Sequence, residues 1–286
     1  MCGIVGYTGN KPAQEIVIDS LKKLEYRGYD SSGIALHEGK LVFSKKEGPI
    51  VNLESVLKPS KSNMAIAHTR WATHGVPSDV NSHPHLSNDG KIAVVHNGTI
   101  DNYLDIKSGL EDEGFEFLSE SDTEVIPNLI SKYYEGDLVK AVSKILDEIQ
   151  GIYTIAAIHV DNSEQIVSVR NETPLVIGLG NSENYVASDI YAILKYTQQI
   201  IYPEDHQIVS ISPNEVNVFD EKLSKIEFEV ETVEKYTEVA EKGGFEHFML
   251  KEIFEQPKAL QDSQTELFVN SPLDKLNLNW KIGSIS

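Results

Sequence analysis

The distribution of apolar residues is the feature of this chain that most restricts its fold. Short strand-like runs dominate residues 151–230, whereas helix-like segments are grouped around residues 11–28 and 121–149. A doubly wound parallel sheet would need a helix after nearly every strand. The separate blocks instead predict an α+β protein with largely antiparallel sheets. Because 40% of the 286 residues are hydrophobic, the chain can bury a sizeable core.

Periodicity and turn residues assign several elements individually. The expected strands are residues 2–9, the two arms of a hairpin within 33–48, 64–70, 92–96 and 152–160. The expected helices are one that starts after Asn10 and ends at Gly28, one that begins with a capping box at Ser121 and Glu124, and one at 137–149. Residues 71–91 form a long polar segment, and loops of that length are usually functional.

The charge balance and the cysteine count exclude several classes of protein. The chain has 25 basic and 44 acidic side chains, a formal net charge of -19, so we expect no nucleic-acid partner and no anionic membrane partner. A single cysteine excludes an intramolecular disulfide framework. We find no secretory signal pattern and no apolar run of the roughly 18–20 residues that cross a bilayer. The expected location is the cytoplasm.

Cys2 is the only cysteine, and such a residue usually behaves as a small buried hydrophobic group. Its position indicates chemistry instead. Once Met1 is removed, Cys2 carries a thiol and a free α-amine, whose unperturbed pKa values are about 8.5 and about 7.7–8.0. The amine can therefore accept the thiol proton at modest cost, as in enzymes with an N-terminal threonine nucleophile. Position alone leaves both interpretations open.

Arg70 and Trp71 stand where the apolar run 64–70 meets the long polar segment. The planar guanidinium of Arg70 can bind a substrate carboxylate through two hydrogen bonds, and Trp71 can exclude water when a loop closes. The more common arrangement, without other evidence, is a surface arginine stacked on a tryptophan.

The dipeptide Asn97-Gly98 follows the strand expected at 92–96. Asn-Gly most often forms a tight hairpin turn. The residues after it do not alternate as a returning strand would, and they indicate the start of a helix. An asparagine amide beside a glycine N–H can also bind a developing negative charge, so Asn97 and Gly98 are candidates for an oxyanion hole.

Five of the nine histidines lie within residues 68–96, which raises the hypothesis of a metal site. They are His68, His74, His83, His85 and His96. The chain has no HExxH motif and no second cysteine, so we expect no metal ligands and interpret most of these side chains as hydrogen-bonded structural residues. The glycines do not fit a phosphate-binding loop, and no cofactor is expected. Asp122, taken alone, fits the favourable interaction of an acidic residue with the first turn of a helix.

Six segments, taken in order, resemble the glutaminase half of the glucosamine-6-phosphate synthases, the glutamine:fructose-6-phosphate amidotransferases. They are MCGIVGY, LEYRGYDSSGIA, AHTRWATHG, NSHPH, VVHNGTIDN and SESDTE. The resemblance covers roughly residues 2–255, and the sequence departs from the family only mildly, at Ser32 and Ser121. It implies an N-terminal-nucleophile hydrolase fold, a four-layer αββα sandwich in which two antiparallel sheets lie between helical layers.

The resemblance also implies roles for individual residues. Cys2 would attack the side-chain amide of glutamine, Asn97 and the Gly98 N–H would bind the oxyanion, and water would hydrolyse the resulting thioester. Arg27 would be structural near the site. The implied substrate-binding residues are Arg70 for the α-carboxylate, Asp122 for the α-ammonium group, Thr73 and His74 as further pocket residues, and Trp71 as a gate.

The expected domain organisation is a glutamine amidotransferase domain at 1–230 followed by a linker and partial interdomain segment at 231–286. The second region is charged and helix-like, and HFMLKEIFEQP resembles the segment between the two halves of the synthase. Nothing in the sequence resembles the family's sugar-isomerase domains, so we expect a partner domain or chain that uses fructose 6-phosphate as ammonia acceptor. Two alternatives stay open: a catalytically silent glutamine-binding regulatory module, and a metallohydrolase that uses the histidine cluster.

Overall fold

The computed structural model describes residues 2–233, 245 and 248–270, with residues 248–249 and 262–270 described by their backbone alone. Contacts divide the chain into two units, Met1–Val239 and Ala240–Ser286. Within the second unit lies helix α6 (Phe248–Asn270), which contains Pro257. The expected boundary after residue 230 stays a prediction.

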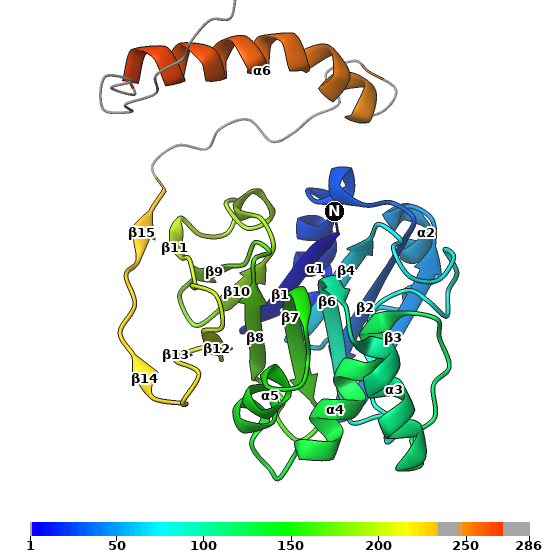
Figure 1. Ribbon diagram of the computed structural model, residues 1–286. Coiled ribbons are helices and arrows are strands. Elements are labelled where there is room, and N and C mark those ends of the chain that lie inside the picture. The colour runs from blue at the N-terminus through cyan, green and yellow to red at the C-terminus, as the bar shows by residue number, and fades with distance from the viewer. Residues whose placement is uncertain (1, 234–244, 246–247, 271–286) are drawn as a thin grey trace, which may run out of the picture. The chain divides into compact units, whose positions relative to one another are not determined.

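Two antiparallel sheets form the centre of the first unit (Figure 1). The eight-stranded sheet has the order β15-β11-β9-β10-β1-β4-β2-β3, and the seven-stranded sheet has the order β14-β13-β12-β8-β7-β6-β5. The strands of the first sheet are β1 (Gly3–Thr8), β2 (Ser31–His37), β3 (Leu41–Glu47), β4 (Met64–Arg70), β9 (Val176–Leu179), β10 (Asn184–Ala187), β11 (Gln199–Ile201) and β15 (Glu231–Thr232). The strands of the second sheet are β5 (His85–Leu86), β6 (Ile92–Ile100), β7 (Gly151–His159), β8 (Ile166–Asn171), β12 (Ile208–Ile211), β13 (Val216–Phe219) and β14 (Lys225–Ile226).

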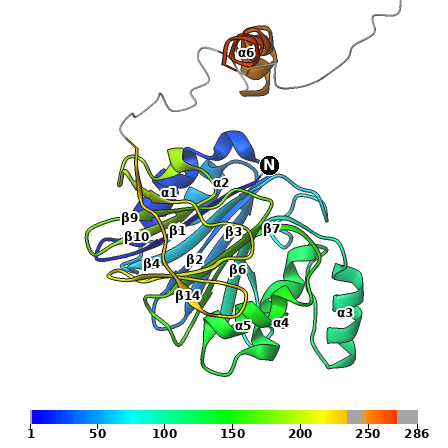
Figure 2. The ribbon, with the colours of Figure 1, turned by 60° about the vertical axis from the view of Figure 1, so that its left-hand side comes forward.

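Helices cover the outer faces of the two sheets (Figures 1 and 2). They are α1 (Ala13–Lys22), α2 (Ile50–Glu54), α3 (Tyr103–Asp112), α4 (Val125–Tyr133) and α5 (Leu138–Leu146). Because side chains alternate along a strand, β1 places Ile4 in the core between the sheets and Val5 in the core under α1. On the second sheet, Val94 packs in the core under α4 and α5, whereas Val95 lies between the sheets. The expected αββα architecture is confirmed.

Several local predictions are confirmed. The strand expected at 64–70 is β4, and the hairpin expected within 33–48 is formed by β2 and β3, with Gly39 at φ +70° in its turn. The helix expected at 137–149 is α5, where the Asp137 side chain accepts hydrogen bonds from the N–H groups of Val139 and Lys140.

The helix expected to end at Gly28 ends earlier, at Lys22, and a short 3₁₀ turn at Glu25–Arg27 follows it. Gly28 caps this turn with an extended backbone and does not adopt the left-handed conformation of a glycine at the end of an α-helix. A Cβ atom at this position would lie 2.7 Å from the Arg70 carbonyl carbon and 2.8 Å from the Trp71 nitrogen. The glycine therefore allows this turn to pack directly against the end of β4.

The capping box expected at Ser121 and Glu124 forms only in part. The Ser121 side chain accepts a hydrogen bond from the Thr123 N–H at the start of the 3₁₀ turn Asp122–Glu124. The Glu124 carboxylate instead accepts from the Leu118 and Ser119 N–H groups at 2.9 and 2.7 Å. These contacts hold the loop that leads into Asp122.

The helix indicated by the residues after Gly98 is confirmed as α3 (Tyr103–Asp112), whereas the dipeptide Asn97-Gly98 itself does not form a hairpin turn. It lies inside β6, which continues to Ile100, and Gly98 pairs with Tyr153 of β7. Tyr103 is the first residue of the helix that follows. Pairing with β7 therefore overrides the local tendency of Asn-Gly to turn.

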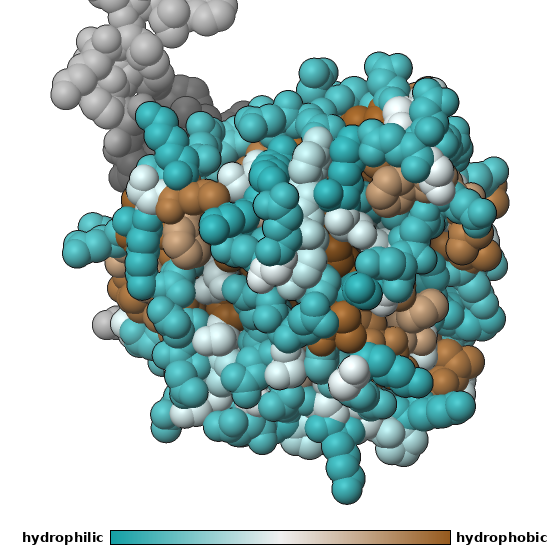
Figure 3. All heavy atoms as spheres, turned by 90° about the horizontal axis from the view of Figure 1, so that it is seen from below, coloured by the Kyte–Doolittle hydropathy of each residue, from teal (hydrophilic) through white to brown (hydrophobic). Residues whose placement is uncertain are grey.

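The hydrophilic side chains of the protein lie largely on its surface, as the 24% of charged residues in the sequence leads one to expect. Figure 3 shows a face covered largely by hydrophilic residues, with hydrophobic side chains in small groups between them. Within the part of the chain that the structure describes, no helix is both long enough and apolar enough to span a membrane.

Candidate active site

Cys2 lies directly before β1, at the end of the sheet where β4 finishes beside it. The Trp71 N–H donates a hydrogen bond to the Cys2 Sγ at 3.2 Å, and the Sγ lies 3.5 Å from the Trp71 carbonyl oxygen. Burial raises the pKa of the Cys2 thiol, while the Trp71 N–H and the Arg70 charge favour the thiolate. The resting thiol therefore needs a base to become a nucleophile.

Arg70 is the last residue of β4, and its side chain is buried. Its Nη2 donates hydrogen bonds to the carbonyl oxygens of His74 and Gly75, so the guanidinium holds the turn after Trp71. Its Nη1 is buried without a hydrogen-bond partner among the described residues. A buried guanidinium nitrogen without a partner is costly, and a carboxylate is the ligand that best satisfies it.

Gly98 and Asn97 approach Cys2 from the opposite sheet. Gly98 has φ +118°, and a Cβ atom there would lie 2.0 Å from the Ile152 carbonyl oxygen. The position therefore requires glycine. The Asn97 Nδ2 donates to the Cys2 carbonyl oxygen at 3.2 Å, and its Oδ1 lies 3.0 Å from the His68 Nε2.

Asp122 closes the far side of the site. Its Oδ2 accepts a hydrogen bond from the Ile100 N–H at 2.9 Å and lies 3.8 Å from the His74 Nδ1. His74 also makes an edge contact with Tyr103, with the ring centroids 5.2 Å apart. A buried carboxylate in this place can pair with a cationic group of a ligand.

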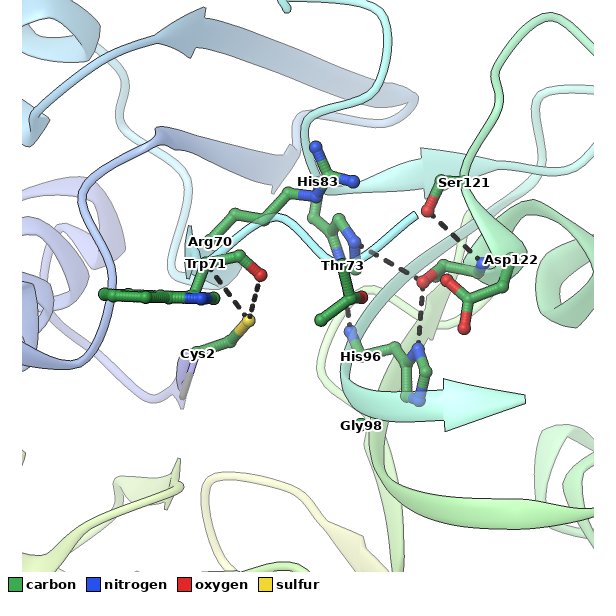
Figure 4. Close-up of a pocket in the computed structure, with 10 residues that line it drawn as sticks. Cys2, Arg70, Trp71, Thr73, His83, His96, Gly98, Ser121 and Asp122 are labelled. Carbon is green, nitrogen blue, oxygen red and sulfur yellow. Dashed lines mark hydrogen bonds between the residues drawn. The ribbon is translucent and has the colours of Figure 1, made fainter. Parts of the chain in front are cut away.

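One cavity collects most of the residues that the sequence indicated (Figure 4). The predicted residues that line it are Cys2, Arg70, Trp71, Thr73, Gly98 and Asp122. Asn97 and His74 do not line it, but each contacts a residue that does. Trp71 is 38% exposed, and its ring makes an edge contact with Tyr29. The structure thus brings the predicted residues together, and their individual roles stay predictions.

The histidine cluster adjoins this cavity, and two of its members, His83 and His96, line it. Among the described residues, no group of three or more histidine, cysteine, aspartate or glutamate side chains is arranged to hold a metal ion. His68 instead stacks on His83 with the ring centroids 4.1 Å apart, and His83 meets the edge of His85 at 4.9 Å. Burial lowers the pKa of His68 to about 3 and holds the pKa values of His83 and His85 well below 6.5. These imidazoles are therefore neutral at physiological pH.

Some residues of the site were not predicted. His83, His96, Ser121 and Thr123 also line the cavity. Arg27, expected near the site, donates from Nε to the Cys2 carbonyl oxygen at 3.1 Å, and its Nη1 pairs with Asp189 at 2.9 Å. No sequence motif indicated Asp189, because its partner Arg27 is 162 positions away in the chain.

Comparisons with known proteins agree with this geometry. Residues 68–195 match the family model of the glutamine amidotransferase domain. The chain contains a glutamine amidotransferase domain. The resemblance seen in the six sequence segments is confirmed, and the matched range includes Arg70, Gly98 and Asp122 of the cavity, whereas Cys2 lies outside it.

The curated relatives that match include several named glutamine--fructose-6-phosphate aminotransferase (isomerizing), among them those of three organisms. The protein of Caldanaerobacter subterraneus is 50% identical over 97% of this chain and 47% of its own length. That of Clostridium acetobutylicum is 47% identical over 97% of this chain and 46% of its own. For Aquifex aeolicus the identity is 50%, over 92% of this chain and 45% of the relative. The chain thus spans about half the length of the curated relatives it matches.

A solved structure shares the fold. The glutamine phosphoribosylpyrophosphate amidotransferase of B. subtilis matches with a TM-score of 0.68 and 26% identity, over 78% of this chain and 50% of that one. A second structure, described as the allosteric regulatory enzyme of purine biosynthesis, matches over the same shares with a TM-score of 0.69. This similarity supports the N-terminal-nucleophile hydrolase fold of the amidotransferase domain.

Proposed function

We propose that the chain hydrolyses the side-chain amide of glutamine to glutamate and ammonia through a thioester on Cys2. The observation that carries this proposal is the buried, unpartnered Nη1 of Arg70 in the same cavity as the Cys2 thiol and the Asp122 carboxylate. An α-amino acid presents a carboxylate and an ammonium group at a fixed separation, and these two side chains match both charges. Thr73 and His74 complete the proposed pocket, and Trp71 is proposed to gate its mouth.

The first chemical step joins Cys2 to the substrate. After removal of Met1, the free α-amine of Cys2 takes the thiol proton, and Sγ attacks the amide carbon. The carbonyl oxygen becomes an oxyanion, which accepts hydrogen bonds from the Asn97 amide and the Gly98 N–H. The proton passes to the amide nitrogen, the C–N bond breaks, and ammonia leaves. Because burial raises the pKa of the Cys2 thiol, this base is needed at neutral pH.

The second step releases glutamate. A water molecule gives a proton to the Cys2 α-amine as its oxygen attacks the thioester carbon, and the same two donors stabilise the oxyanion again. The C–S bond breaks, the thiol regains its proton, and glutamate dissociates. No metal or cofactor takes part in this proposal.

The names of the curated relatives suggest where the ammonia goes. We propose that it aminates fructose 6-phosphate at a sugar-isomerase domain or chain, so that this chain performs the ammonia-donating half of glucosamine 6-phosphate synthesis. The proposed location is the cytoplasm. Residues 1–230 are the proposed catalytic domain, and residues 231–286 are the proposed linker and partial interdomain segment.

Glutamine incubation tests the proposal. We expect the purified chain to release glutamate and ammonia, the Cys2→Ala variant to release neither, and the active protein to have an intact mass without Met1. Activity that survives in Cys2→Ala, or that a chelator removes, would point to the metallohydrolase alternative. Glutamine binding without any turnover in the unmodified chain would leave the silent regulatory module.

A further inference from the structure

His68 is a fully buried residue of β4 that the proposed chemistry does not use. Along β4, Ile66 packs in the core between the sheets, so His68, two positions further, points to the same side. Along β6, Val95 packs in that core, and Asn97 follows it by two positions. The alternation of both strands therefore brings His68 and Asn97 face to face, with 3.0 Å between the Nε2 and the Oδ1.

The Cys2 carbonyl oxygen fixes the direction of the hydrogen bonds in this group. A carbonyl oxygen only accepts, so the Asn97 atom 3.2 Å from it is the amide nitrogen. The opposite Asn97 atom is therefore Oδ1, which also only accepts. The His68 Nε2 next to it must carry the proton. Because burial lowers the pKa of His68 to about 3, the ring stays neutral and keeps this single tautomer throughout the pH range of an assay.

His68 is itself held firmly. Its ring stacks on His83 with an interplanar angle of 11°, and its backbone lies between β1 and β2, paired with Ile4 and Gly33. The His83 Nδ1 in turn accepts a hydrogen bond from the His96 N–H at 3.2 Å. A donor mounted in this way fixes the rotation of the Asn97 amide.

We propose that His68 is a positioning residue for the hydrolysis of glutamine: its Nε2–H holds the Asn97 amide with the nitrogen toward Cys2. One hydrogen of the Asn97 Nδ2 then binds the Cys2 carbonyl oxygen, and the second is directed to the oxyanion that forms on the substrate. Without the His68 donor, the Asn97 amide can rotate and present its oxygen, which would repel the oxyanion. This inference rests on the proposed function.

Kinetics of a small set of variants test the inference. His68→Phe keeps a flat ring on His83 and removes the donor, whereas the amide nitrogen of His68→Gln can take the place of Nε2. We expect His68→Phe to lower kcat by about 10- to 100-fold, because a group displaced by about 1 Å can cost 10²-fold. KM for glutamine should stay within threefold, since Arg70 and Asp122 are untouched. We expect His68→Gln to recover most of the lost rate.

A double variant separates positioning from a general structural role. In an Asn97→Ala background, adding His68→Phe should change kcat by less than twofold, because the amide that His68 orients is absent. Effects that multiply in the double variant would overturn the inference, as would a His68→Phe enzyme within threefold of the original kcat. If His68→Phe does not fold, His68→Asn replaces it, since the shorter amide cannot reach Asn97.

His159 provides the matched control. It is a buried histidine at the last position of β7, away from the part of β7 that pairs with Asn97 and Gly98. Its ring stacks on Tyr134, and its Nδ1 accepts a hydrogen bond from the Asp161 N–H at 3.0 Å. We expect His159→Phe to lower thermal stability without changing kcat. Failure of the unmodified chain to release glutamate would reject the proposed function itself, whereas an active chain that is indifferent to His68 would reject only this inference.

Discussion

Replacing Gly98 with alanine should remove both stability and turnover, and the structure gives the size of each effect. The new Cβ would lie 2.0 Å from the Ile152 carbonyl oxygen and 3.0 Å from the Tyr153 Cα, at a φ of +118°. Relieving the contact to 3 Å or more requires β6 and β7 to move apart locally by about 1 Å. Backbone strain costs about 1–3 kcal/mol and overpacking about 1–3 kcal/mol, so we expect a loss of about 2–6 kcal/mol in the free energy of unfolding.

The same displacement moves the Gly98 N–H away from the proposed oxyanion. Loss of one such donor lowers kcat by about 10² to 10³. Glutamate release measured at a temperature where circular dichroism shows the Gly98→Ala variant to be folded gives kcat separately from stability. Gly90→Ala is the control, because Gly90 has φ +69° but no atom within 4 Å of its would-be Cβ. We expect that control to lose about 1–2 kcal/mol of stability and no turnover. A folded Gly98→Ala enzyme within threefold of the original kcat would refute the role of Gly98.

Three further predictions concern other parts of the molecule. Arg70→Lys should raise KM for glutamine more than it lowers kcat, because lysine cannot form the two-pronged contact with a carboxylate; an unchanged KM would contradict the assigned role. Residues 1–286 alone, given glutamine and fructose 6-phosphate, should yield glutamate without amino sugar, and amino sugar should appear only when a chain with the isomerase domains is added. Burial holds the pKa of His85 below its unfolded value near 6.5, so unfolding takes up a proton and the free energy of unfolding falls as the pH drops below 6.5. Urea unfolding at pH 7 and pH 5 should therefore show a smaller pH-dependent loss in His85→Phe than in the original chain, and equal losses would count against a neutral buried His85.

Local sequence patterns predicted the elements whose structure depends on local forces. The apolar run Met64–Arg70 forms β4, and the helix expected at 137–149 is α5. Residues 92–96 were expected as a strand for the same reason, and they form the first part of β6.

Long-range contacts decided the features that the sequence could not predict. Asn97-Gly98 has a strong local tendency to turn, but the pairing of Gly98 with Tyr153 keeps both residues in β6. Gly28 resembled a helix cap, whereas its structural role is the close approach to the backbone of Arg70 and Trp71. Neither partner is near in the chain, so no local pattern could reveal the contact.

For the candidate site, too, the sequence indicated individual residues but not the long-range contacts between them. Residue type and position raised Cys2 and Arg70 as candidates but left other interpretations open, and the resemblance to a family assigned their expected roles and added Thr73 and Asp122. The contacts that orient these groups were not predicted: His68 reaches Asn97 across 29 positions of the chain, and Asp189 reaches Arg27 across 162. Buried polar groups of this kind become visible only when the two sheets are packed together.

Cys2, the proposed nucleophile, directly precedes β1 of one sheet, and the proposed donors Asn97 and Gly98 lie in β6 of the other. The inter-sheet core that aligns them is built from interlocking apolar side chains such as Ile4, Ile66, Val95 and Ala156. Backbone hydrogen bonds fix distances within each sheet, whereas the offset of one sheet against the other depends mainly on the packing of these side chains, together with a few bonds such as that from the Asn97 Nδ2 to the Cys2 carbonyl oxygen. The rate of the proposed reaction therefore depends on how accurately the facing sides of the two sheets are aligned. A core substitution that shifts one sheet against the other by a fraction of the spacing between residues would stop the reaction, although the backbone hydrogen bonds within each sheet would stay intact.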